Sequence, residues 1–119
     1  MKLLIVEDSG LVSRRLQLAF APLSALETEI VDRFGLALER FRVLQPELVI
    51  LDIDLPDGNG LDLLKAIKGE RPATRVLMFS NHDIFRQRCI FLRADYFFDK
   101  SWEFEELAAT VQSMVEAAP

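Results

Sequence analysis

The chain has 119 residues, half of them apolar and 28% charged, which fits one soluble globular domain over residues 1–119. The formal net charge of −5 argues against direct binding of nucleic acid, and no apolar run reaches the roughly 18–20 residues of a membrane span. The single cysteine, Cys89, excludes an internal disulfide and fits a cytoplasmic protein.

The first predicted strand is the apolar run at residues 3–6, which ends in Glu7 and Asp8. These acids follow only four apolar residues, so the run is too short for a signal peptide. Ser9 is a good N-cap for the next helix, and Pro22 should shorten its last turn because proline removes a helix hydrogen bond. The apolar face of this helix has the expected spacing: Val12, Leu16, Ala19, Phe20 and Leu23.

Strands and helices alternate along the rest of the chain. The apolar run at residues 48–51 shows no alternation and lies between Pro46 and Pro56-Asp57-Gly58, which is typical of a strand buried on both faces of a parallel sheet. Ser101 is predicted to cap the final helix. The other predicted strands are 27–31, 75–79 and 96–98, and the other helices run over about 36–44, 61–69 and 84–92.

This order of elements predicts an α/β fold, a doubly wound five-stranded parallel sheet with five helices on its two faces. The chain ends soon after the last predicted helix, so we expect no second domain. The carboxyl ends of parallel strands lie on one edge of the sheet. We therefore expect that edge to collect the polar residues that follow the predicted strands: Glu7, Asp8, Asp52, Ser80 and Lys100.

Carboxylates crowded at one edge repel each other and need a cation. Mg²⁺ meets this need, because it is a hard ion that takes one or two carboxylates and keeps waters for a phosphate. A lysine and a hydroxyl beside it suit a phosphoryl group, and a carboxylate can act as the nucleophile that forms an acyl phosphate. The strand ends therefore predict a site for Mg²⁺ and a phosphoryl group.

Several segments together carry a resemblance to a known family. They are Ile5-Val6-Glu7-Asp8, the pattern Asp52-x-Asp54-x-Pro56-x-Gly58-x-Gly60-Leu61, Ser80 after an apolar strand, and Ala94-Asp95-Tyr96-Phe97-Phe98-Asp99-Lys100. In this order and spacing the chain resembles the receiver domains of two-component response regulators, including single-domain regulators of the chemotaxis type. The resemblance covers essentially the whole chain and implies a flavodoxin-like sheet of strand order 2-1-3-4-5.

The resemblance implies roles for the acidic residues. Asp52 would be the phosphoacceptor, taking a phosphoryl group from a phosphohistidine on a histidine kinase or phosphotransfer domain. Asp8 and Asp52 would ligate Mg²⁺ directly, Glu7 through water, and Asp54 through its backbone carbonyl. The chain would be no enzyme beyond catalysing its own phosphoryl transfer and dephosphorylation.

Further roles concern the switch. Lys100 would pair with phosphoryl oxygens. Ser80 would swing to hydrogen-bond the acyl phosphate, and Phe97, at the aromatic switch position, would move inward with it. The fourth helix, fifth strand and last helix are predicted to form a face that binds a downstream protein or a second copy. On the fourth helix this face would expose Ile84, Arg88 and Phe91.

Other residues near the site are assigned by position. Asp54, Asn81 and His82 are expected to tune access to the phosphoryl group or its lifetime, although an exposed loop histidine is an equally good interpretation of His82. Arg93 stands where the family often closes the fourth helix with glycine, so that helix is expected to end differently. Ser101 stands where proline often follows the lysine. Core or helix-start packing is expected for Cys89, Phe98, Trp102 and Phe104, whereas Phe97 is the exception because of its expected switch role.

Two alternatives stay open at this point. Asp52-x-Asp54 after an apolar strand is similar to haloacid-dehalogenase-type phosphatases, in which the first Asp is a nucleophile and the second a general acid/base. Against this reading, Pro56 stands where Thr or Val is expected, and the chain leaves no room for a cap domain. A purely structural interaction module would leave the acidic cluster unexplained.

Overall fold

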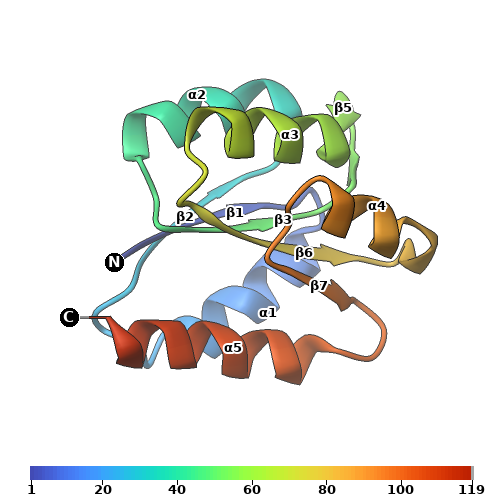
Figure 1. The fold of residues 1–119 in the computed structure, drawn as a ribbon. Coiled ribbons are helices and arrows are strands. Elements are labelled where there is room, and N and C mark those ends of the chain that lie inside the picture. Colours follow the sequence, from blue (N-terminus) through green and yellow to red (C-terminus); the bar gives the residue numbers. More distant parts are fainter. Residues whose placement is uncertain (119) are drawn as a thin grey trace.

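Five parallel strands form the central sheet of the computed structural model, which describes residues 1–118 (Figure 1). They are β1 (Lys2–Val6), β2 (Glu27–Val31), β3 (Leu48–Leu51), β6 (Arg75–Ser80) and β7 (Tyr96–Asp99). Their order across the sheet is β2-β1-β3-β6-β7, with every neighbouring pair parallel. Counted among themselves, these strands follow the expected order 2-1-3-4-5, so the predicted doubly wound fold is confirmed.

Helices cover both faces of the sheet (Figure 1). The helices α1 (Gly10–Phe20) and α5 (Phe104–Ala117) pack on one face, and α2 (Phe34–Leu44), α3 (Gly60–Glu70) and α4 (Arg86–Phe91) pack on the other. A short antiparallel hairpin, β4 (Asp54–Leu55) and β5 (Gly58–Asn59), follows β3, and a 3₁₀ turn, η1 (Asp83–Phe85), precedes α4. None of these helices within residues 1–118 has the length and apolar character needed to cross a bilayer.

The middle strand β3 explains why its sequence shows no alternation. All four of its residues are buried, and successive side chains of a strand point to opposite faces. Val49 and Leu51 therefore pack with α2 and α3, whereas Leu48 and Ile50 pack with α1 and α5. The strand that carries Asp52 at its end is thus fixed from both sides.

The helix α2 is capped by a residue far away in the sequence. It begins at Phe34, two residues before the predicted start, and Asp57 in the β4–β5 turn accepts the N–H groups of Phe34 (2.6 Å) and Gly35 (2.9 Å). The hydrogen bond from Gly35 is the largest of the effects that lower the pKa of the Asp57 carboxyl. A Cβ at Gly58 would lie 2.7 Å from the Phe34 ring, so glycine permits the close approach.

The start of α5 differs from the prediction. The residue at its N-cap is Glu103, and Ser101 instead donates its backbone N–H to Asp99 Oδ1 at 2.7 Å. The chain turns at Asp99, whose carbonyl accepts the N–H groups of Trp102 and Glu103. This turn delays the helix and leaves Trp102 83% exposed, so the expected packing of Trp102 is wrong.

The end of α4 keeps the geometry that a glycine would favour. Arg93 has a φ of 72°, in the left-handed region, and the N–H of Ala94 reaches the carbonyl of Cys89 at 2.9 Å. The expected different ending is therefore not observed, because arginine adopts the conformation itself. Cys89 is fully buried, as predicted, and burial raises the pKa of its thiol to about 11.

Candidate functional site

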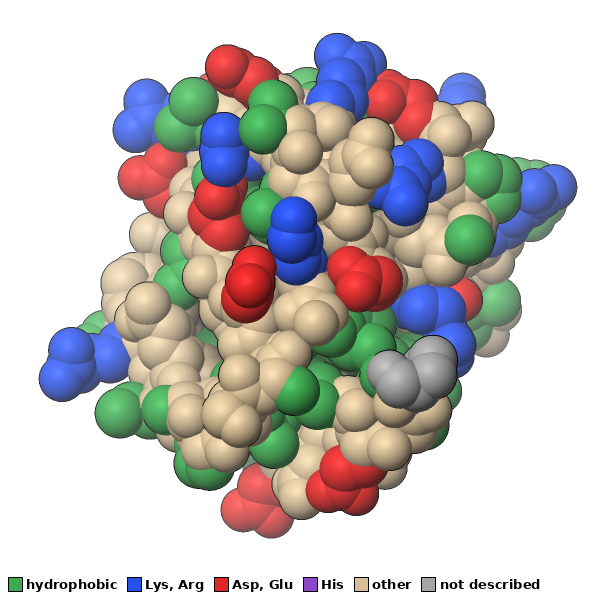
Figure 2. All heavy atoms as spheres, turned by 90° about the vertical axis from the view of Figure 1, so that its left-hand side faces the viewer, with side chains coloured by type: hydrophobic (Ala, Val, Ile, Leu, Met, Phe, Trp, Pro, Cys, Tyr) green, Lys and Arg blue, Asp and Glu red, His purple; other side chains and the backbone are tan. Residues whose placement is uncertain are grey.

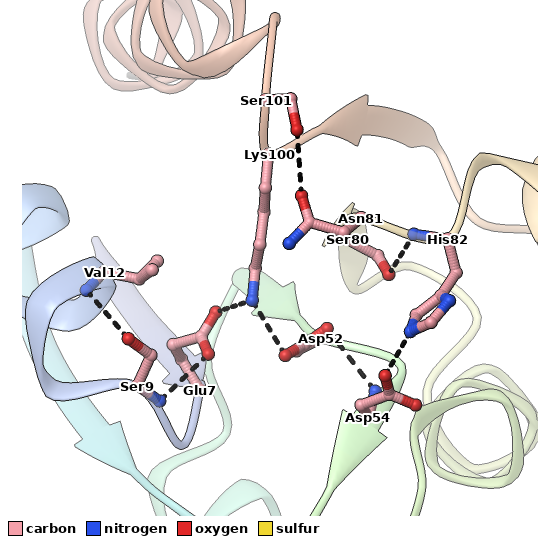
Figure 3. Close-up of polar contacts among 10 residues, drawn as sticks. All are labelled: Glu7, Ser9, Val12, Asp52, Asp54, Ser80, Asn81, His82, Lys100 and Ser101. Atoms are coloured by element: carbon pink, nitrogen blue, oxygen red, sulfur yellow. Dashed lines mark hydrogen bonds and ion pairs between the residues drawn. The ribbon is translucent and has the colours of Figure 1, made fainter.

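The ends of β1, β3 and β7 bring Glu7, Asp52 and Lys100 into direct contact (Figure 3). Lys100 Nζ lies 2.8 Å from Asp52 Oδ2 and 2.6 Å from Glu7 Oε1. Asp52 is only 5% exposed and Glu7 only 3%. Two carboxylates buried side by side are costly unless a cation is close, and Lys100 supplies one positive charge between them.

Burial and pairing act against each other in this cluster. Burial raises the pKa of Glu7 above its ordinary value, and the hydrogen bond from Lys100 only partly opposes this. Burial would lower the pKa of Lys100, but its hydrogen bonds to Asp52 and Glu7 outweigh burial and raise it. Lys100 therefore stays charged at neutral pH, as a partner for phosphoryl oxygens must.

Asp8 completes a group of oxygen donors that fits a divalent cation. Glu7, Asp8 and Asp52 each offer a carboxylate oxygen within 4.8 Å of the others. Two of these residues are buried, and Asp8 is exposed at the opening. Lys100 neutralises one of the three carboxylates, which leaves excess negative charge. An all-oxygen donor set of this kind matches the preference of Mg²⁺.

The side chain of Asp54 points away from Asp52 and contacts His82 (Figure 3). Its carboxylate is 71% exposed, and His82 Nε2 lies against Asp54 Oδ2. The backbone N–H of Asp54, by contrast, is directed at Asp52 and lies 3.4 Å from Oδ1. Asp54 and His82, two of the three residues expected to tune the site, thus lie in contact with each other.

Ser80 is the last residue of β6 and Asn81 follows it, but the two side chains differ in their surroundings. Ser80 is fully buried, and its Oγ accepts the backbone N–H of His82 at 3.1 Å (Figure 3). Asn81 is exposed and accepts a hydrogen bond from Ser101 Oγ at 3.2 Å. The serine hydroxyl is thus turned toward the β6–α4 loop, from which a side-chain rotation would be needed to face the Asp52 group.

Phe97 is 6% exposed, and the guanidinium carbon of Arg86 lies 4.7 Å from the centre of its ring. No local pattern of residues singles out Arg86. Its partners Phe97 and Glu103 lie 11 and 17 residues further along the chain, beyond any local pattern.

Gly60 supports Asp52 from behind. A Cβ at this position would lie 2.0 Å from the backbone oxygen of Asp52, and the Gly60 N–H donates to the carbonyl of Ile53 at 2.7 Å. Only glycine can approach the end of β3 so closely. The motif that contains Gly58 and Gly60 was a sequence signal for this contact, although its physical reason appears only in the fold.

A hollow lies at the opposite edge of the sheet, and Met1 and Ala118 are among the residues that line it. Figure 2 shows apolar side chains in this hollow, below a group of charged ones. Its volume is about 610 Å³, and Leu48, Arg75, Tyr96 and Met114 are among its lining residues. The one acidic residue in its lining is Glu47, so it lacks a carboxylate group like that around Asp52. The carboxylates around Asp52, at the edge where the strands end, therefore make that edge the better candidate for a functional site.

The fold and this edge define a doubly wound α/β protein with a cluster of carboxylates at the ends of its strands that could hold a cation. Residues 3–112 match the family described as response regulator receiver domain, and the chain belongs to that family. "Regulatory protein AtoC" of Escherichia coli is 30% identical over 118 residues, which is 97% of this chain and 25% of AtoC.

Two further matches place the chain among varied proteins. A "Protein-glutamate methylesterase/protein-glutamine glutaminase 2" of Chromobacterium violaceum is 29% identical over 80 residues, 66% of this chain and 22% of that protein. The solved signal receiver domain of a DNA-binding response regulator from Colwellia psychrerythraea has a TM-score of 0.88, at 22% identity and 98% coverage of both chains. The chain thus spans about a quarter of the length of the two curated relatives named here.

Proposed function

We propose that this receiver accepts a phosphoryl group on Asp52, with Mg²⁺ held by Asp8 and Asp52, by Glu7 through water and by the Asp54 backbone carbonyl. The observation that carries the proposal is the Lys100 ammonium between the buried carboxylates of Asp52 and Glu7. A structural ion pair would need one carboxylate, whereas Lys100 contacts two, and Asp8 adds a third carboxylate oxygen within 4.8 Å of theirs.

The two oxygens of Asp52 differ in the proposed reaction. Oδ2 accepts the hydrogen bond from Lys100, and Oδ1 has only the long contact of 3.4 Å from the Asp54 N–H. We assign Oδ1 as the nucleophile, because it is the less engaged oxygen. It attacks the phosphorus of a phosphohistidine, the P–N bond breaks, and the electron pair leaves with the imidazole nitrogen of the donor.

The other residues stabilise the charge of the transferred group. Bound Mg²⁺ supplies the positive charge that neutralises the phosphoryl oxygens. Lys100, which contacts Asp52 Oδ2, would pair with one of these oxygens, and Ser80 would rotate to donate its hydroxyl proton. The exposed pair of Asp54 and His82 would control the approach of water to the acyl phosphate, and the exposed Asn81 would restrict it sterically.

The signal would pass to the face formed by α4, β7 and α5. Ile84, in η1 directly before α4, is 86% exposed and would offer an apolar side chain to a protein partner or a second copy. Phe91 is 80% exposed, but it lines a hollow together with Lys65 and Gly69 of α3. A histidine kinase or phosphotransfer domain would supply the phosphoryl group in the cytoplasm. We expect beryllofluoride with Mg²⁺ to change the size or partner binding of the protein in chromatography; no change would count against this output.

The direct test is incubation with Mg²⁺ and phosphoramidate, a small phosphodonor, followed by intact-mass measurement. A receiver gains one phosphoryl group that decays by its own hydrolysis, and Asp52→Asn gains none. Fast turnover of the donor with no phosphorylated protein accumulating would instead indicate a phosphatase with Asp52 as nucleophile. Equal labelling of Asp52→Asn would show that the assigned residue is wrong.

A further inference from the structure

Arg86, the first residue of α4, joins three elements at the output face. Its Nε donates to Asp83 Oδ1 at 2.8 Å, its Nη1 to the backbone carbonyl of Phe97 at 3.1 Å, and its Nη2 to Glu103 Oε1 at 2.7 Å. The guanidinium also lies over the Phe97 ring, a cation–π arrangement. One side chain thus contacts the residue at the aromatic switch position both at its backbone and at its ring.

The far end of this contact is fixed as well. Glu103 is the N-cap residue of α5, and the same Oε1 that pairs with Arg86 accepts the backbone N–H of Asp99 at 3.0 Å. Asp99 directly precedes Lys100 in the chain. Arg86 therefore connects the start of α4 to the start of α5 across the end of β7, next to the lysine of the phosphoryl site.

Phe97 and Ser80, the two residues of the expected switch, are not in the same state in this structure. Phe97 is already inward at 6% exposure, whereas the Ser80 hydroxyl is hydrogen-bonded to the His82 backbone. The serine rotation therefore does not hold the ring inward. The groups that touch the ring and its carbonyl include the guanidinium of Arg86.

We propose that Arg86 is a positioning residue that holds Phe97 inward ahead of phosphorylation and thereby favours occupancy of the Asp52 site. This inference rests on the proposed function. If the inward ring and the bound phosphoryl group favour the same state, a residue that stabilises one raises the affinity for the other. Arg86 then sets how readily the site fills, although it touches neither Asp52 nor its ligands.

The test is a beryllofluoride titration in the presence of Mg²⁺, read by the fluorescence of Trp102. This is the sole tryptophan of the chain, and it is exposed two residues after Lys100. We expect Arg86→Gln to weaken beryllofluoride binding by about five-fold or more, the lower range of typical coupling between sites. Arg14→Gln removes the same charge from an exposed position of α1 and should bind as the wild type does.

Two further measurements separate positioning from general damage to the fold. In the Phe97→Leu background, Arg86→Gln should have no additional effect on affinity, because no ring remains to be held. Fluorine NMR of protein labelled with 4-fluorophenylalanine should show the Phe97 signal displaced in unliganded Arg86→Gln and restored by beryllofluoride. Glu103→Gln, which loosens the other end, should shift both readouts in the same direction and serves if Arg86→Gln folds poorly.

Wild-type affinity in Arg86→Gln, or an equal loss in the Phe97→Leu background, would overturn the inference while leaving the phosphoacceptor assignment intact. If the wild-type chain binds no beryllofluoride, or if Asp52→Asn binds it equally well, the proposed function fails and the inference fails with it.

Discussion

Replacing Lys100 with methionine should expose the electrostatic cost of the acidic site. Lys100 has a side chain 13% exposed and contacts carboxylates that are 2% and 6% exposed. Removing one partner of a buried ion pair typically costs 3–5 kcal/mol, because the remaining charge stays buried. Since this cluster lies at the mouth of the sheet, we expect Lys100→Met to lower the free energy of unfolding by about 3 kcal/mol at pH 7 without Mg²⁺.

The stability cost of Lys100→Met should depend on pH through the carboxyl group of Glu7. The folded pKa of Glu7 is raised above its ordinary 4.5, and it should rise further without the Lys100 hydrogen bond. A group with a raised folded pKa contributes stability below its unfolded pKa and loses it as the pH rises through the folded value. The penalty of Lys100→Met should therefore shrink as the pH falls toward 4.5, when Glu7 takes up a proton.

Urea unfolding at several pH values, with and without Mg²⁺, measures these effects. Mg²⁺ should stabilise Lys100→Met more than the wild type, because it replaces the lost positive charge. Lys65→Met, at an exposed position of α3, removes the same charge and should unfold nearly as the wild type does. A Lys100→Met protein as stable as this control at pH 7 would refute the electrostatic account of the cluster.

Three other predictions follow from single contacts. Asp57→Asn should lower the urea midpoint and speed amide exchange at Phe34 and Gly35. The folded pKa of Asp57 lies below its ordinary 3.8, so its contribution to stability is present above pH 3.8 and is lost as the pH falls through the folded value. The urea midpoints of wild type and variant should therefore become equal in acid. Gly60→Ala should cost about 1–3 kcal/mol or more in urea unfolding, because its Cβ would lie 2.0 Å from the Asp52 carbonyl oxygen, whereas Gly69→Ala, with nothing within 4 Å, should stabilise α3. The Cys89 thiol, with a pKa of about 11, should react with a disulfide reagent only in unfolded protein; rapid native reaction would contradict its burial.

Much of this architecture could be predicted because it depends on short apolar runs. Continuous apolar residues predict strands that are buried on both faces. The topology of a parallel sheet then brings Glu7, Asp52 and Lys100 to one edge. Residue patterns and strand ends were therefore sufficient to predict that these three side chains lie together. They carried no information on side-chain direction, such as the outward turn of Asp54.

The features that sequence reasoning missed depend on contacts between distant segments. The cap of α2 comes from Asp57, 23 residues after Phe34, whereas Arg33 at the N-cap position makes no side-chain cap hydrogen bond. The exposure of Trp102 and the late start of α5 follow from a turn at Asp99 that competes with the expected Ser101 cap. Arg86 is one of several arginines in its segment, and only the fold shows which of them reaches Phe97.

We propose that Asp52 is the residue that carries the phosphoryl group. Brief labelling with Mg²⁺ and phosphoramidate, reduction by borohydride and peptide mass spectrometry would locate it, because borohydride converts an aspartyl phosphate to homoserine. Our account predicts homoserine at position 52 alone, dependent on Mg²⁺. Homoserine at Asp8 or Asp54 instead, or an unmodified residue 52 in protein that has gained phosphate, would contradict it.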